Sequence, residues 1–111
     1  MKLNLFLIKI LFFLSIHNLI ALDIIGEYEK IKGLKEPDKI KIINIVKLKN
    51  NTYLLKCSKY DGKKTVLKGE LESNVLTVKA PFGVEYYLTF EGNKIEVCDN
   101  TGDCSSIYNK K

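Results

Sequence analysis

The segment 84–97, VEYYLTFEGNKIEV, constrains the fold more than any other stretch because it specifies both a hairpin and its buried face. Every second residue in its first half is apolar, which is the pattern of a strand with one side inside. Gly92-Asn93 provides a two-residue turn, since both residues tolerate a positive φ. The pairs that this turn predicts are Phe90 with Ile95, Leu88 with Val97 and Glu91 with Lys94, so that apolar meets apolar and acid meets base.

Turn-forming residues recur along the rest of the chain at roughly the 8- to 12-residue spacing of an all-β protein. A first strand is expected at Asp23–Lys30, followed by a long loop at Ile31–Asp38. We therefore predict an all-β domain: an antiparallel up-and-down meander of about eight short strands, closed into a small barrel that leaves no free edge. A flat or sandwiched meander is the alternative.

The loops also predict the register. Two-residue turns are expected at Asn50-Asn51 and Ser73-Asn74, three-residue loops at 61–63 and 81–83, and a five-residue loop at 99–103. The pairs that follow are Leu48 with Tyr53, Val46 with Leu55, Asn44 with Cys57, Cys57 with Leu67, Leu55 with Gly69, Tyr53 with Leu71, Leu71 with Leu76, Val78 with Tyr86, Cys98 with Cys104, Val97 with Ser105 and Ile95 with Ile107.

This register predicts an inner face without any charge. Its members are Ile24, Tyr28, Ile40, Ile42, Asn44, Val46, Leu48, Tyr53, Leu55, Leu67, Leu71, Leu76, Val78, Val84, Leu88, Phe90, Ile95, Val97, Ser105 and Ile107. The interior of an eight-stranded barrel is just wide enough to be filled by such side chains. A packed core without a ligand is therefore expected, and any interior ligand must be neutral or keep its head at the mouth.

The first 21 residues have the order of a secretory signal peptide: Lys2, an apolar block, and the small residue Ala21 at the expected cleavage point. Lys9, His17 and Asn18 interrupt the apolar run, which falls short of the roughly 20 residues that a membrane span needs. We expect cleavage, with a single domain at 22–111 in the periplasm or outside the cell. A retained anchor is the alternative, and only then would the chain contact a membrane.

Removing the signal peptide changes the chemistry that the chain can offer. Lys2 and Lys9 are lost, which leaves 16 lysines against 13 acids and a net charge of +3, with no arginine or tryptophan. The only histidine, His17, is lost as well. Histidine-based nucleophile systems and the common zinc sites cannot then be assembled. We predict no enzyme, no metal and no cofactor.

Acid catalysis and nucleic-acid binding are also disfavoured. The strand pattern places Glu70, Glu85, Glu91 and Glu96 outside, in solvent, where acid catalysis is not favoured. A carboxylate-based hydrolase is therefore only an alternative. Base recognition depends on arginine, which is missing, so a nucleic-acid partner is not expected.

Gly26-Glu27-Tyr28 on the first strand, before a long loop and a series of hairpins, resembles the opening of small lipocalin-like barrels. Those proteins usually carry tryptophan where this chain has Tyr28, and no further motif of the family is present. The resemblance implies a secreted barrel whose interior or mouth binds something apolar.

Cys98 and Cys104 face each other across the last hairpin, within the range of a disulfide, and we predict a structural bridge between them. Cys57 points inward and is expected to be an inert thiol. The loop between the two cysteines lacks the ligand pattern of an EF-hand and is expected to be a plain turn.

Lysines on the second and third strands form a candidate anion-binding face, which is otherwise a solvated outer surface: Lys39, Lys41, Lys47, Lys49 and Lys56. Phe82 at a loop tip and Tyr87 beside the disulfide are candidate partner contacts. We expect a binding protein for an unknown protein or a small apolar or anionic ligand, acting through the loops Ile31–Asp38 and Pro81–Gly83 or through the lysines. The alternatives are an inhibitor or immunity factor for an envelope enzyme, a hydrolase, and a structural envelope component.

Overall fold

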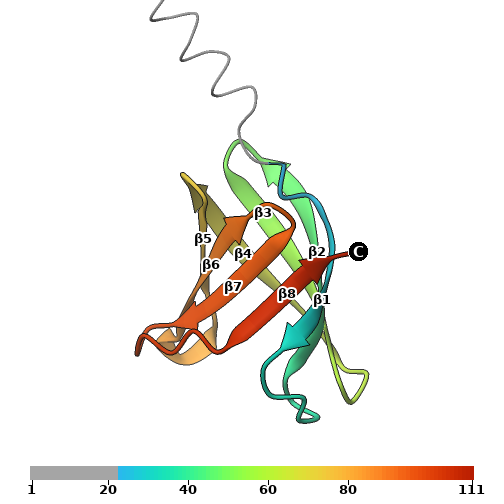
Figure 1. The fold of residues 1–111 in the computed structure, drawn as a ribbon. Helices are drawn as coiled ribbons and strands as arrows, with labels where there is room; N and C mark the ends of the chain where they lie inside the picture. Colours follow the sequence, from blue (N-terminus) through green and yellow to red (C-terminus); the bar gives the residue numbers. More distant parts are fainter. Residues whose placement is uncertain (1–22) are drawn as a thin grey trace, which may run out of the picture.

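In a computed structural model, which describes residues 23–111, the chain is an eight-stranded antiparallel barrel (Figure 1). The strands are β1 (Gly26–Lys32), β2 (Ile40–Lys49), β3 (Thr52–Lys59), β4 (Lys64–Glu72), β5 (Val75–Lys79), β6 (Glu85–Glu91), β7 (Lys94–Asp99) and β8 (Ser106–Lys110). Each strand pairs with the next, and β8 pairs with β1, so the meander closes. The predicted fold class is confirmed, whereas the predicted signal peptide lies outside the described residues.

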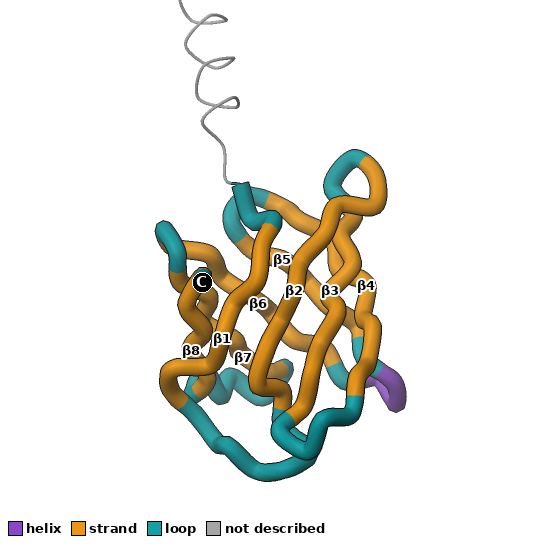
Figure 2. Tube along the Cα trace, turned by 90° about the vertical axis from the view of Figure 1, so that its right-hand side faces the viewer, coloured by secondary structure: helices purple, strands orange, loops and turns teal. Residues whose placement is uncertain are grey.

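The two ends of the barrel differ in their connections (Figures 1 and 2). The tight turns at Asn50-Asn51, Ser73-Asn74 and Gly92-Asn93 lie at one end. The longer loops lie at the other, which we call the mouth: residues 33–39, 60–63, the 3₁₀ turn η1 (Pro81–Gly83) and 100–105. In residues 23–111, no helix is long and apolar enough to cross a bilayer.

Three of the predicted registers are confirmed. Phe90 pairs with Ile95, Leu71 with Leu76, and Val78 with Tyr86. In each case the residues of the turn determine its length. Phe82 and Gly83 both have positive φ in η1, at 66° and 76°, so the loop reverses the chain within three residues.

The predicted register between β2 and β3 is wrong by one residue. The Asn50-Asn51 turn forms as expected, with Lys49 opposite Thr52, but a shift follows at once, and Lys47 lies opposite Tyr53. One extra residue exchanges the two faces of a strand. The core therefore receives Ile43 and Ile45 instead of the predicted residues, which lie on the outer face: Ile42, Asn44, Val46 and Leu48.

The other two differences are a slip of two residues and a slip of one. Leu55 lies opposite Leu67, and Tyr53 opposite Gly69, so β4 keeps its predicted inner face but is displaced along β3. In the last hairpin Val97 lies opposite Ser106 instead of Ser105. Tyr108 consequently points inward, and Ile107 does not belong to the core.

The end of the barrel opposite the mouth is closed by aromatic side chains. Tyr28 and Phe90 pack edge to face, with ring centroids 6.0 Å apart, and the Tyr28 hydroxyl donates to the carbonyl oxygen of Ile24 at 2.9 Å. Burial raises the pKa of Tyr28 to about 12, an effect to which Asp23 adds. A Cβ on Gly26, which has a φ of 145°, would lie 2.7 Å from Lys110 Cε, so the glycine allows the Lys110 side chain to lie across this end.

Candidate functional site

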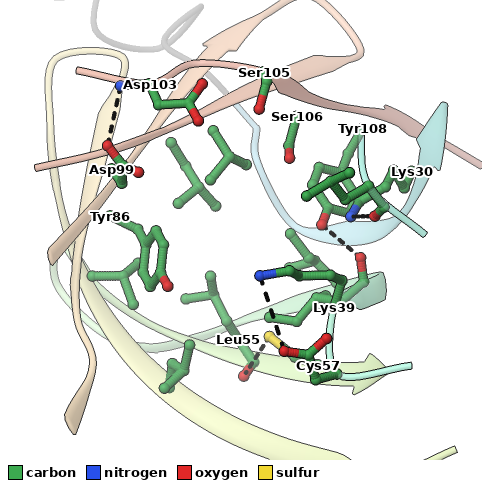
Figure 3. A pocket seen from close by; sticks show the side chains of 18 residues that line it. Lys30, Lys39, Leu55, Cys57, Tyr86, Asp99, Asp103, Ser105, Ser106 and Tyr108 are labelled. Carbon is green, nitrogen blue, oxygen red and sulfur yellow. Dashed lines mark hydrogen bonds and ion pairs between the residues drawn. The ribbon is translucent and has the colours of Figure 1, made fainter. Parts of the chain in front are cut away.

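A cavity of about 360 Å³ opens at the mouth and reaches into the barrel (Figure 3). Its inner walls are aliphatic and come from β2 to β7: Ile40, Ile43, Leu55, Leu67, Val78, Leu88 and Val97. Leu34, Asp38 and Lys39 border it from the loop 33–39, and Asp99, Asp103 and Ser105 border it from the β7–β8 connection. The expectation of a filled interior is therefore wrong at the mouth, although the opposite end is packed.

Lys30 is the unexpected member of this wall. It continues the inward alternation that begins at Ile24, before β1, and passes through Tyr28, and it is only 7% exposed. A register shift between β1 and β8 follows directly after it. The prediction of an inner face without charge is wrong at this position, because the alternation was not extended past Tyr28.

The Lys30 ammonium contacts three neutral groups. Its Nζ donates to the carbonyl oxygen of Leu34 at 2.5 Å and lies 5.6 Å from the ring centroids of both Tyr60 and Tyr108. In Figure 3, Lys30 and Tyr108 lie together on one side of the cavity, with Tyr86 and Asp99 on the other. Desolvation lowers the pKa of Lys30, and Lys39 and Lys35 lower it further.

Tyr108 connects the last strand to the second. Its hydroxyl donates to the carbonyl oxygen of Ile40 at 2.6 Å, and burial raises its pKa. Sequence reasoning missed both Lys30 and Tyr108. The signal for Lys30 was its position two residues after Tyr28 in an alternating strand, whereas nothing in the sequence marked the one-residue shift that turns Tyr108 inward.

The cysteines lie as predicted. Cys98 and Cys104 form a disulfide. Both sulfurs lie close to the Glu96 carboxylate, but with the bridge formed they are not thiolate ligands for a metal. Cys57 is a free thiol, 2% exposed, in the wall of the cavity, and burial raises its pKa to about 12. At neutral pH it is therefore protonated and a poor nucleophile.

The predicted lysine face is not assembled. Lys39 borders the cavity, and Lys41 Nζ lies 6.0 Å from the centroid of the Tyr60 ring. Lys56 is on the outer face of the barrel, opposite Asn44. Lys47 lies opposite Tyr53 and Lys49 opposite Thr52, on either side of the register shift. Because that shift exchanges faces, the five lysines do not form one row. Whether any of them binds an anion stays a prediction.

The two candidate partner contacts differ in exposure. The Phe82 side chain is fully exposed, at 102%. Tyr87 is half-buried, and its hydroxyl donates to Glu85 Oε2 at 2.6 Å, which raises the pKa of the tyrosine. Phe82 is therefore the freer of the two to meet another molecule.

The fold and the site define a class of protein: a small closed barrel, plugged at one end, with a mostly aliphatic cavity at the other. A scan against protein-family models matched none, and searches of curated proteins and of solved structures likewise found no match. The structure thus establishes the closed eight-stranded barrel.

Proposed function

We propose that this chain is an exported binding protein, without chemistry of its own, that holds a small and largely apolar molecule in the cavity at its mouth. The cavity of about 360 Å³ carries the proposal, because it lies at the lower end of the 300 to 1,000 Å³ range of ligand pockets. Its walls would bury the apolar part of a ligand, as in lipocalin-like barrels, and the open end gives access.

Several features support binding over catalysis. The part of the chain after the expected signal peptide has no histidine, and the thiol in the cavity is held protonated. The acids that border the cavity are at its rim: Asp38, Asp99 and Asp103. Asp99 Oδ1 already accepts hydrogen bonds from Thr101 and Asp103, which lower its pKa. The Asp99 carboxylate is therefore held in its charged form, which cannot serve as a general acid.

Neighbouring residues on opposite faces of β4 offer a matched test. Leu67 lines the cavity, whereas Val66 is 59% exposed on the outer face. The neutral dye N-phenyl-1-naphthylamine should bind the protein with a rise in fluorescence. Leu67→Trp, which fills the cavity, should abolish that rise, and Val66→Trp should preserve it. Failure of the unmodified protein to bind the dye, or equal binding by the Leu67→Trp variant, would contradict the proposal.

A second candidate function is contact with another protein, as an inhibitor or immunity factor of an envelope enzyme would make. Phe82 favours it, because the side chain is fully exposed at the tip of η1 with a φ of 66°. An aromatic side chain in this position contributes little to folding, and aromatic residues including phenylalanine are enriched in protein interfaces. Cross-linking in the native envelope should yield an adduct that Phe82→Ala removes and that Val66→Ala, on the outer sheet, retains. An adduct unaffected by Phe82→Ala would rule out this contact.

A further inference from the structure

Lys30 is a buried cation without a counter-ion in the part of the chain that the structure describes. No carboxylate oxygen of residues 23–111 lies within 4.0 Å of its Nζ, although 93% of the residue's surface is covered. A charge withdrawn from water to this extent is normally paired. The wall of the cavity therefore contains a charge for which residues 23–111 supply no counter-ion.

The groups around Lys30 leave room for an anion. The Leu34 carbonyl occupies one of the three N–H donors of the ammonium, and the Tyr60 and Tyr108 rings are uncharged. The charges that affect Lys30 most are the cations of Lys39 and Lys35, which lower its pKa after desolvation. The local potential is therefore positive.

Two acids of the rim, Asp38 and Asp99, interact with groups other than Lys30. The Asp38 carboxylate lies 4.0 Å from Lys39 Nζ, and Asp99 is bonded within its own loop. Neither forms an ion pair with Lys30. An anion entering the mouth would meet the Lys30 ammonium, which pairs with no carboxylate of residues 23–111.

We infer that the ligand is a small amphipathic monocarboxylate, whose acidic head pairs with Lys30 and whose apolar chain lies against Val78 and Leu88. This inference rests on the proposed function. Two free N–H donors suit one carboxylate, whereas a phosphate dianion needs more donors and more positive charge. A cavity of about 360 Å³ favours a single short chain or a small ring over a two-chain lipid.

Titration calorimetry with octanoate and octanol at neutral pH tests the head group at constant chain length. Octanoate should bind about ten- to a hundredfold more tightly, the range of a hydrogen bond to a charged group. Lys30→Met should remove this preference, because the carboxylate of octanoate then has no cation to pair with. Lys30→Arg should keep the preference, and Lys68→Met, an exposed lysine of β4, should change neither affinity.

The outcomes separate this inference from the proposed function. Equal binding of octanoate and octanol would overturn the carboxylate head and leave the cavity as an apolar site. Tighter binding of octyl phosphate than of octanoate would overturn the monocarboxylate. Failure of both compounds and of the neutral dye would overturn the proposed function as well. If Lys30→Met does not fold, nuclear Overhauser contacts decide: octanoate C2 protons should be close to the Lys30 ε-methylene protons, and their absence would overturn the assignment.

Discussion

Lys30 and Tyr108 face each other where the last strand closes on the first, with the lysine Nζ 5.6 Å from the centroid of the tyrosine ring. The tyrosine hydroxyl donates to Ile40, and the lysine donates to Leu34, so the two side chains fasten both ends of the loop 33–39. The seam of the barrel and the rim of its cavity therefore depend on the same pair. A substitution of either residue should therefore affect both the closure of the barrel between β1 and β8 and the access to the cavity.

Lys30 should make the free energy of unfolding depend on pH in the alkaline range. Its pKa in the folded state is below the ordinary value of 10.5, so between these two values the unfolded chain binds more protons. The free energy of unfolding should accordingly gain a contribution as the pH rises through this window, and lose it as the pH falls. Urea denaturation from pH 7 to 11 should show that wild type gains stability relative to Lys30→Met. The free energies of unfolding of wild type and Lys68→Met should differ by the same amount at every pH. A difference between wild type and Lys30→Met that does not change with pH would contradict the prediction.

Cys57 should have the opposite effect. Its thiol titrates at about 12 in the folded protein against 9.0 ordinarily, so above pH 9.0 the unfolded chain loses a proton that the folded chain keeps. The contribution of Cys57 to the free energy of unfolding is at its full value below pH 9.0. Above pH 9.0 it falls by about 1.4 kcal/mol for each pH unit, up to the pKa of the thiol in the folded protein. Cys57→Ala should lack this slope, even if the smaller side chain costs stability at every pH. Equal slopes for wild type and the variant would show that the thiol is not buried.

The two-residue slip of β4 could have been predicted from the sequence. A three-residue hairpin loop needs a left-handed residue at its third position, and Gly62, with a φ of 88°, meets that need only if the loop begins at Tyr60. Lys59 N indeed donates to Lys63 O at 2.8 Å. The same rule at Gly83, which has a φ of 76°, predicts the η1 hairpin correctly.

The shift in β2 is of another kind, because the segment 42–46 is apolar on both faces. Burying Ile43 and Ile45 leaves Ile42 and Val46 half-buried outside and Leu48 46% exposed. Alternation cannot choose between two aliphatic faces. The choice depends on how β2 meets β1 and β3 in the closed barrel, and that information is not local. The same shifts decide which side chains of β2 and β4 face the cavity, and this part of the site could not be predicted from alternation alone.

The disulfide should stabilise the last hairpin. Cys98 and Cys104 are six residues apart, and closing so short a loop contributes about 2 kcal/mol in the chain-entropy model. Cys98→Ser/Cys104→Ser should lower the free energy of unfolding by about this amount. Reductant should lower the free energy of unfolding of the wild type to that of the double variant. The free energy of unfolding of the double variant should not change. A wild type that is insensitive to reductant under unfolding conditions would contradict the bridge.

Gly69 is a crowded position in the barrel wall. It lies opposite Tyr53 on one side and Val78 on the other, and an added Cβ would be 2.9 Å from Leu76 Cγ and 3.0 Å from Val78 Cγ2. Gly69→Ala should therefore destabilise the protein by about 1–2 kcal/mol, after a small gain from the stiffer unfolded chain. The cost should shrink in a Val78→Ala background, where one of the crowded methyl groups is gone. Chemical denaturation of the four proteins of this cycle measures the coupling. Additive costs would mean that the two side chains do not compete for the same space.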